Sequence, residues 1–422
     1  MGQSILRPGK PVFQIAVFCT LSLLCGCRHS PWQLWQSYSA RFIDPETGRV
    51  LSGDASDPNG NQQHTTSEAQ AYALFFALAA NDRPTFDRVL SWTQTNLAAG
   101  DLSTHLPAWL WGKDTDGTWK VLDPNPASDA DVWIAYSLVE AGRLWNSPAD
   151  AALGRALMAS IAKNEVIDLP GFGPMLLPGP TGFQHGDTFT LNPSYLPLFV
   201  FERFAAVDPA GPWQAIALNI PRLLAQSSPH GYAMDWVEYF PYDGFYPVPP
   251  PAPPATSPAT PPSASAPVAA ANPPAAAATT PTKPDAVGSY DAIRVYLWAG
   301  MISPADPARA SILDAVPAMS AWLTDHDAPP EKVSQDGIPV QKEGPIGFSA
   351  AVLPYLRAFP NLSRASVRQL IRLDAQKSAS SGLYGKDKAY YDQCLALFST
   401  GFLQARFRFG PGGELNVEWK RE

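Results

Sequence analysis

The chain has 422 residues, of which 45% are hydrophobic, so it is long enough to bury one large core or two to three smaller ones. Its formal net charge is −8 and only 16% of its residues are charged, which leaves no basic stripe that could neutralise phosphates, so nucleic acid is not an expected partner. Aromatic residues make up 11%, and the flat rings of Trp and Tyr suit sugar faces as well as protein cores.

Residues 1–27 have the layout of an export signal. Arg7 and Lys10 precede the apolar run from Val12 to Cys25, which is too short to span a membrane comfortably as a helix. The run leads into Leu-Cys-Gly-Cys, which resembles a bacterial lipobox ending at Cys27. Two outcomes stay open, a lipid anchor on Cys27 or plain cleavage and release. Either one predicts a periplasmic or secreted protein.

Past the leader, hydrophobic spacing predicts about a dozen helices. Segments 84–98 and 363–377 carry one apolar stripe, whereas 67–80 and 131–145 are apolar nearly all round. Helices that are alternately half covered and fully covered predict an all-α (α/α)6 barrel, with six inner helices wrapped by six outer ones. The expected helices are 31–42, 67–80, 84–98, 131–145, 149–164, 194–206, 212–227, 290–302, 307–325, 348–359, 363–377 and 390–407.

The loops between these helices are long and aromatic. Residues 105–112, a turn at 113–117 and residues 118–121 predict a short β-hairpin at the rim of the barrel. Pro197 falls inside the expected helix 194–206, so it must kink this helix or mark its first turn.

The mature body holds a single cysteine, Cys394, because the other three lie in the leader. No internal disulfide can therefore form. The neighbours of Cys394 are apolar, so we expect a buried, unreactive thiol. The six His residues show no zinc spacing, and the chain has no Gly-rich phosphate loop, so we expect neither a metal nor a cofactor.

The sequence ASDADVWIAYSLVEAGRLW, residues 127–145, places Asp129 and Asp131 at the start of an almost wholly apolar helix. Ser128 and Asp131 have the spacing of a capping box, but capping explains only one of the two acids. The stretch resembles the signature of glycoside hydrolase family 8, which runs Ala, Ser or Thr, Asp, Ala or Gly, Asp, two free positions, Ile, Ala, one free, Ser, two aliphatics, one free, Ala, three free and Trp. Every constrained position of that signature is met here.

The resemblance extends from about Trp32 to Phe409. Residues 344–351 (GPIGFSAA) and 390–393 (YYDQ) are similar to the endoglucanase that accompanies bacterial cellulose synthase. Only residues 247–284 break the match. This segment is mostly Pro, Ala, Ser and Thr, so it cannot bury enough surface to fold. Because the resemblance resumes directly after it, we expect a disordered insertion within one domain spanning 28–422.

Hydrolysis of a glycosidic bond needs one carboxyl that donates a proton and one that activates water. Glu68 is the first candidate. It has a structural alternative, because Thr65 and Glu68 fit a capping box. The resemblance implies that Glu68 is the proton donor, since Ser67-Glu68 and Ala71-Tyr72 match the family's setting for that residue. An apolar helix beneath would keep the carboxyl protonated, because desolvation raises its pKa.

Asp291 is the second candidate, in the sequence SYDAIRVYLW of residues 289–298. Asp291 and Arg294 are three residues apart on one helix face, so they could form a purely structural ion pair. The resemblance implies instead that Asp291 is the water-activating base. A neighbouring arginine would lower its pKa and keep it ionised, as a base requires.

The remaining site residues are implied by the same resemblance. Asp129 would hold and distort the sugar at the cleavage point rather than act as a nucleophile, because an inverting mechanism needs none. Asp131 is assigned to the helix cap or, with Arg294, to substrate binding. Several aromatic side chains are candidate sugar platforms, although each could equally be core: Trp109, Trp111, Tyr195, Trp236 and Trp298.

The sequence thus predicts a monomeric, inverting endo-β-1,4-glucanase that trims nascent cellulose, with a β-1,4-glucan chain as substrate and the cellulose synthase and export complex as a possible partner. Xylan, chitosan and mixed-linkage glucan stay open as substrates, because the family covers them. The alternative from another class is a non-catalytic glucan-binding or scaffolding subunit of the secretion machinery. A pure binder needs no proton donor, so the presence of all three acids argues against it.

Overall fold

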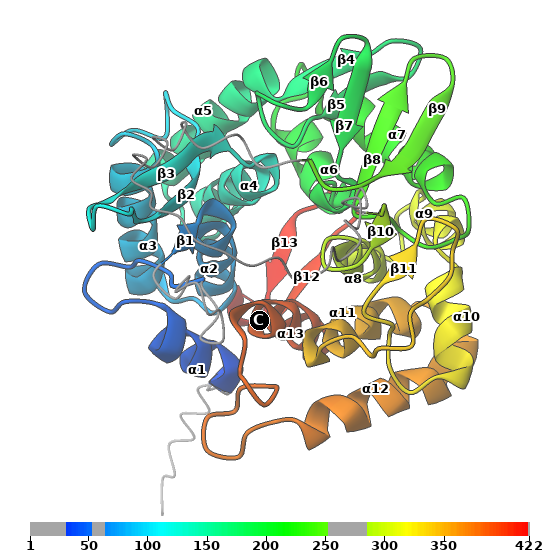
Figure 1. The fold of residues 1–422 in the computed structure, drawn as a ribbon. Coiled ribbons are helices and arrows are strands. Elements are labelled where there is room, and N and C mark those ends of the chain that lie inside the picture. Colours follow the sequence, from blue (N-terminus) through cyan, green and yellow to red (C-terminus); the bar gives the residue numbers. More distant parts are fainter. Residues whose placement is uncertain (1–30, 53–63, 252–284, 421–422) are drawn as a thin grey trace, which may run out of the picture. The chain divides into compact units, whose positions relative to one another are not determined.

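Within the unit Trp32–Glu422, helices surround a common centre and are joined by loops that carry short strands (Figure 1). The structure is a computed structural model that describes residues 31–52, 64–251 and 285–420. The expected export signal and its candidate lipid site Cys27 lie outside these ranges. So does most of the Pro- and Ala-rich segment. Its expected start at residue 247 is too early, because residues 247 and 248 still belong to a strand.

Five helices near the centre are buried on nearly all sides. Every residue of α2 except Glu68 is buried, and so is every residue of α8. A sixth helix, α6 (Leu198–Val207), joins them with its fully buried first turn. These helices are apolar all round because other helices cover both their inner and their outer sides. The five are α2 (Ser67–Ala79), α4 (Ser128–Leu144), α8 (Ile293–Met301), α11 (Ile346–Arg357) and α13 (Tyr390–Leu403).

The remaining helices lie outside this group and bury only one face (Figure 1). In α12, for example, Ala365 and Leu373 are buried, whereas Val367 and Ile371 point to solvent. The single apolar stripe in their sequences matches this one-sided packing. These helices are α1 (Gln33–Phe42), α3 (Arg83–Leu97), α5 (Pro148–Asn164), α7 (Trp213–Ser227), α9 (Arg309–Ala315), α10 (Ala318–Asp325) and α12 (Ser363–Ala375).

Proline explains two differences from the predicted helix boundaries. The expected helix 307–325 is two helices, because Pro317 lies at the N-cap of α10 and the chain breaks before it. Pro197 is the N-cap residue of α6, so it precedes the first turn and does not kink the helix. At the C-terminal end, α13 stops at Leu403 because the following residues form a strand.

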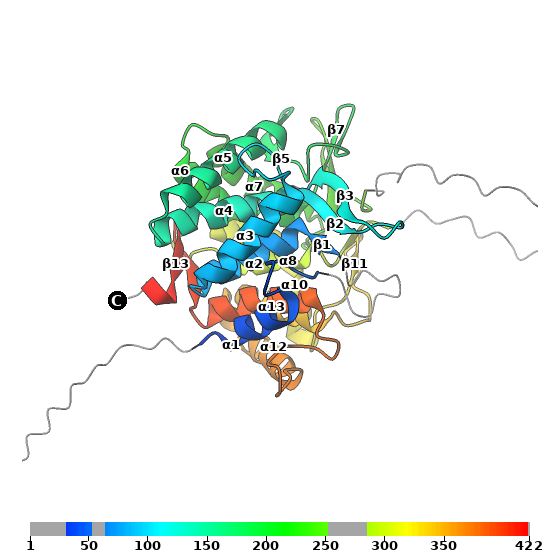
Figure 2. The same ribbon diagram turned by 90° about the vertical axis from the view of Figure 1, so that its left-hand side faces the viewer.

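The described residues also contain five small antiparallel sheets, where we predicted only one hairpin. Their strands are too short to give a clear alternating pattern. Strands β1, β2, β3, β7 and β11 lie toward one end of the helices, and β13 lies toward the other (Figure 2). The sheets are β1 (Thr65–Thr66) with β2 (Ala108–Lys113) and β3 (Trp119–Pro126), β4 (Val166–Leu169) with β5 (Gly173–Leu176), β6 (Gln184–His185) with β7 (Thr188–Leu191), β8 (Trp236–Phe240) and β9 (Gly244–Val248), β10 (Val287–Gly288) with β11 (Val333–Ser334), and β12 (Phe407–Phe409) with β13 (Leu415–Val417).

The centre of the helix group is aromatic. The Trp133 ring lies 4.9 Å from that of Phe75, 5.2 Å from Phe398 and 5.3 Å from Trp298, measured between centroids. Such close ring contacts fix the helices against one another. Cys394 lies in the same core, and burial raises the pKa of its thiol to about 12, as expected for an unreactive cysteine. None of the helices in the described ranges is long and apolar enough to cross a membrane.

Candidate active site

Glu68, Asp129 and Asp291 come from three inner helices and meet at one end of the helix group. Glu68 is the second residue of α2, Asp129 is the second residue of α4, and Asp291 lies two residues before α8. The N-termini of these helices thus face one region. A helix N-terminus carries partial positive charge, which favours carboxylates there.

Arg294 connects these acids. Its guanidinium is almost fully buried, and one nitrogen, Nη1, donates to Asp129 Oδ2 and to the Tyr72 hydroxyl, both at 3.1 Å. The other nitrogen, Nη2, donates to Asp291 Oδ1 at 2.7 Å and to Ser194 Oγ at 2.9 Å. One arginine therefore fixes residues from four separate segments, and its guanidinium contacts two carboxyl groups. Burial, followed by the neighbouring Glu68 carboxyl, nevertheless raises the pKa of Asp129 to about 8.

Glu68 has a different environment. The indole Nε1 of Trp109, on β2, donates to Glu68 Oε1 at 3.2 Å, and the Ser67 hydroxyl lies 3.4 Å from Oε2. Burial raises the pKa of Glu68, and this effect exceeds the lowering by Arg294 and by its hydrogen bonds. A carboxyl with a raised pKa keeps its proton to higher pH, which is the property of a general acid.

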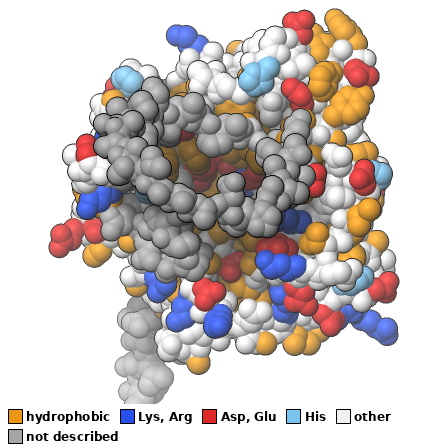
Figure 3. Space-filling model, in the orientation of Figure 1, with side chains coloured by type: hydrophobic (Ala, Val, Ile, Leu, Met, Phe, Trp, Pro, Cys, Tyr) orange, Lys and Arg blue, Asp and Glu red, His pale blue; other side chains and the backbone are white. Residues whose placement is uncertain are grey.

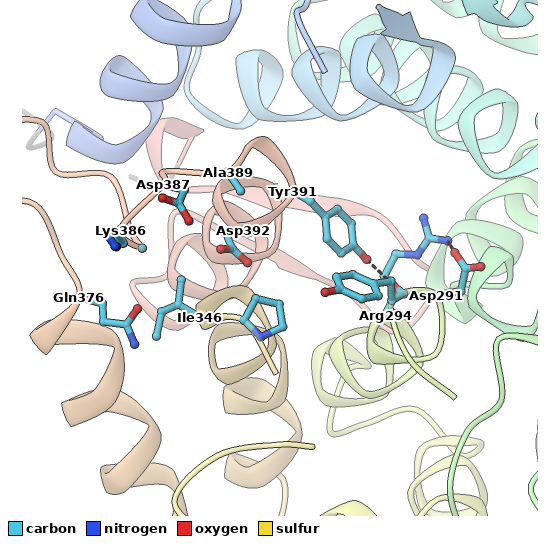
Figure 4. Close-up of a pocket in the computed structure, with 12 residues that line it drawn as sticks. Asp291, Arg294, Ile346, Gln376, Lys386, Asp387, Ala389, Tyr391 and Asp392 are labelled. Carbon is cyan, nitrogen blue, oxygen red and sulfur yellow. Dashed lines mark hydrogen bonds and ion pairs between the residues drawn. The ribbon is translucent and has the colours of Figure 1, made fainter. Parts of the chain in front are cut away.

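Asp291 opens onto solvent. Its side chain is 30% exposed, and it lines a pocket of about 600 Å³ together with Arg294 and Tyr391 (Figure 4). Acidic side chains are visible in the hollow at the centre of this face of the molecule (Figure 3). Water can therefore reach Asp291. Across the described ranges, no group of three His, Cys, Asp or Glu side chains could hold a metal ion.

Asp235 anchors the segment that carries Asp291, and we did not predict this role. Its Oδ1 accepts three backbone N–H groups, from Ser289 at 2.7 Å, Ala292 at 2.8 Å and Asp291 at 3.2 Å. A second anchor is the Tyr391 hydroxyl, which donates to the Tyr290 carbonyl at 2.7 Å. Asp235 lies more than fifty residues before the segment it holds, so no local pattern could have revealed the contact.

Removing this anchor should slow the reaction without unfolding the protein. In Asp235→Ala, three amides lose their acceptor, so Asp291 is no longer held in place, and we expect kcat to fall by about 10²-fold. Asp235→Asn retains a side-chain oxygen and should recover most of that loss. Steady-state kinetics on a soluble β-glucan measures both variants. Equal losses in the two would contradict a positioning role.

With this geometry established, similarity to known proteins decides the family. The model of the family described as "Glycosyl hydrolases family 8" matches residues 9–245. The chain belongs to glycosyl hydrolase family 8. An endoglucanase of Xanthomonas axonopodis pv. citri is 41% identical over 99% of this chain and 97% of the relative. An endoglucanase of Escherichia coli (strain K12) is 38% identical over 99% and 98%.

Solved structures agree with this assignment. The crystal structure of an endo-1,4-D-glucanase from Vibrio fischeri ES114 superposes with a TM-score of 0.75 at 36% identity, covering 92% of this chain and 100% of that one. The endo-beta-1,4-glucanase CMCax from Acetobacter xylinum, at 21% identity and a TM-score of 0.60, shares the fold, with 88% of this chain and 97% of that chain covered. The family 8 chain is thus a glycoside hydrolase.

The two capping boxes predicted in this family 8 chain are wrong. The N-cap of α2 is Thr66, whose Oγ1 accepts from the Ala69 amide, so Thr65 and Glu68 do not form a box. The N-cap of α4 is Ala127, which makes no side-chain cap bond, because the helix starts one residue earlier than the box requires. In neither case does the acid stand at the third position after the N-cap, although the Glu68 carboxyl still accepts hydrogen bonds from its own backbone N–H and from the Thr66 hydroxyl.

Asp131 is neither a cap nor a substrate contact. It is fully buried, and its carboxyl faces the Glu165 carboxyl. Burial, followed by the neighbouring Glu165 carboxyl, raises the pKa of Asp131 well above its usual range. Glu165 is also fully buried. Two buried carboxyls in contact need at least one proton between them, so Asp131 is part of a buried acid pair.

The aromatic candidates of the family 8 chain separate into two groups. Trp109 is 37% exposed beside Glu68, and the rings of Tyr195 and Trp236 meet edge to face at 6.1 Å. Trp298 is instead a core residue, only 4% exposed. Trp111 packs against Trp92 of α3 at 5.2 Å and stacks on Trp119 at 4.9 Å. Trp298 is therefore a packing residue, whereas Trp111 is half-buried and stays a candidate platform.

Proposed function

We propose that the protein is an inverting endo-β-1,4-glucanase in which Glu68 is the general acid and Asp291 the general base. The observation that supports this most is the pairing of unlike environments at one site. Burial raises the pKa of Glu68, whereas Asp291 contacts the guanidinium of Arg294 and is open to water. Opposite environments are what an acid and a base at the same pH require.

Each polar group then has a defined task. Glu68 donates its proton to the oxygen of the leaving sugar, and the indole of Trp109 holds its carboxyl in place. Asp291 removes a proton from a water molecule as that water attacks the anomeric carbon from the opposite face. Asp129 and Arg294, which are held together at 3.1 Å, grip the sugar at the cleavage point.

The substrate assignment is supported by the relatives, which are named endoglucanases and, for Vibrio fischeri, an endo-1,4-D-glucanase. The fold assignment is that of an (α/α)6 barrel. In it, α2, α4, α6, α8, α11 and α13 would form the inner ring, with the one-sided helices outside. The antiparallel pair β2 and β3 would form the hairpin at the rim, because β2 carries Trp109 next to Glu68.

The stereochemistry of the first product tests the mechanism. We expect proton NMR at early times of cellohexaose hydrolysis to show the α-anomer at the new reducing end, because water attacks opposite the leaving group. Spectra must be taken before mutarotation mixes the anomers. A β-anomer as first product would contradict the general-base role of Asp291 and would point to a covalent nucleophile.

We further propose that the protein is exported and trims nascent cellulose near the synthase and export complex. This rests on the leader of residues 1–27 and on the resemblance described above. A lipid anchor at Cys27 and plain release differ in one measurable property. Labelled fatty acid would be incorporated into an anchored protein, and Cys27→Ser would abolish the label.

A further inference from the structure

The four-stranded sheet β6–β9 has one buried face and one open face. Along β8, Val237 and Tyr239 are buried, whereas Trp236, Glu238 and Phe240 are partly exposed. Successive residues of a strand point to opposite faces, so these three share the open face. Directly paired residues share a face as well. Tyr246 of β9 pairs with Glu238 and is 45% exposed, so it also lies on the open face.

Aromatic rings make this face continuous with the active site. Arg294 lies 5.4 Å from the ring centre of Tyr195, which meets Trp236 edge to face at 6.1 Å. Trp236 is parallel to Phe183, with 6.1 Å between ring centres and an angle of 1°. Farther along the sheet, Phe240 and Tyr246 meet at 5.7 Å.

The views of the whole molecule agree with this arrangement. β8 begins close to α8 and runs outward to its turn with β9 (Figure 1), and hydrophobic side chains gather over this part of the surface (Figure 3).

Single exposed aromatics are common on protein surfaces, but two pairs of aromatic rings along one sheet face are not. The set also fits the chemistry of one ligand. A β-linked glucan presents flat C–H faces that stack on aromatic rings and hydroxyl edges that need polar partners. Glu238 lies among the rings, oriented by a 2.9 Å hydrogen bond from the Thr188 hydroxyl, and its carboxylate can accept bonds from such hydroxyls.

We propose that Phe183, Trp236, Phe240 and Tyr246 form a glucan track, which binds the part of a long glucan chain that extends beyond the catalytic acids. The proposal rests on the proposed endo-β-1,4-glucanase function, and it assigns a ligand to a surface outside the cleft. Its occupant is the substrate chain itself rather than a protein, because the track begins at the arginine that contacts Asp129 and Asp291.

The track is tested by the double variant Phe240→Ala/Tyr246→Ala, measured with a short and a long substrate. A cellotetraose bound across the catalytic acids extends only a few sugar units to either side, and Phe240 lies four residues farther along β8 than Trp236, so its kcat/KM should stay within about twofold of wild type. For carboxymethyl-cellulose, we expect KM to rise roughly tenfold with kcat unchanged, because two stacking surfaces are lost. The long glucan should also bind roughly tenfold more weakly to the double variant made in a Glu68→Gln background, measured by affinity electrophoresis.

Tyr242→Ala is the matched control. Tyr242 lies in the turn of the same hairpin and is 89% exposed, but its ring lies over Gly171 of the turn between β4 and β5, next to the strands that pack on the buried face. Tyr242→Ala should leave kcat/KM for cellotetraose and KM for carboxymethyl-cellulose unchanged. An unchanged KM for the long glucan in the double variant, equal losses on both substrates, or an equal loss in Tyr242→Ala would each overturn the track. Failure of the proposed function is distinct, because wild type itself would then not cleave β-1,4-glucan.

Discussion

Glu68→Gln should lower kcat on carboxymethyl-cellulose by roughly 10²–10⁴-fold, while KM changes little. Glutamine has nearly the same shape and keeps an oxygen for the Trp109 indole, which lies 3.2 Å from Glu68 Oε1. It has no proton to give to the leaving oxygen at neutral pH. The loss therefore reports the general acid itself. Loss of viscosity and release of reducing ends measure it.

The pH profile gives a second signature of the same group. Glu68 acts in its protonated form, so the rate falls as pH rises through its pKa. Because burial raises that pKa, the alkaline limb of kcat/KM should lie above the ordinary range of a glutamate, near 4.3. Glu68→Gln should abolish this limb. Glu343→Gln, which alters an exposed acid paired with Arg372, is the matched control and should behave as wild type. Unchanged activity in Glu68→Gln would exclude Glu68 as the acid.

Asp291→Ala should lower kcat by a similar factor, roughly 10²–10⁴-fold, because the proposed mechanism assigns to Asp291 the removal of the proton from the attacking water. Asp291 Oδ1 lies 2.7 Å from Arg294 Nη2, so the variant also leaves a space next to a positive charge. Azide is a small anion that attacks without losing a proton. Added azide should therefore restore part of the rate and give an α-glycosyl azide, detectable by mass spectrometry and NMR.

The two variants differ in this rescue. Azide can replace the water and its base, but it cannot protonate a leaving sugar, so it should not restore Glu68→Gln on an unactivated glucan. A β-glycosyl azide from Asp291→Ala would instead indicate attack on a covalent intermediate. That outcome would remove Asp291 from the role of base and would assign a nucleophile elsewhere in the site.

The helices were predictable because the faces that a helix buries determine the spacing of apolar residues along the chain. Segments 67–80 and 131–145 are apolar on all sides, and both are inner helices within a few residues of the predicted bounds. Where prediction failed, the cause was a local breaker or a short element. Pro317 divides one expected helix, and β8 (WVEYF) carries large apolar side chains on both of its faces, so its sequence shows no alternation.

The three acids could be proposed from the sequence because each is part of a motif whose residues are neighbours along the chain. The pair of Asp291 and Arg294 was visible in the same way, but most other contacts around the site join distant segments and were not. Asp235 holds the segment of Asp291, Glu165 adds to the rise that burial causes in the pKa of Asp131, and Trp298 is covered by the core.

By itself, the sequence determined which segments are helices, which of them are covered all round, and which carboxyls belong to the hydrolase motif. Only the tertiary structure showed that Arg294 also contacts Asp129, that Asp235 holds the segment of Asp291, and which aromatic rings stay open. The physical reason is that hydrophobic periodicity is a property of neighbouring residues. The pKa of a side chain and the exposure of an aromatic ring depend instead on the residues that the fold places next to them, and many of these are distant in the sequence.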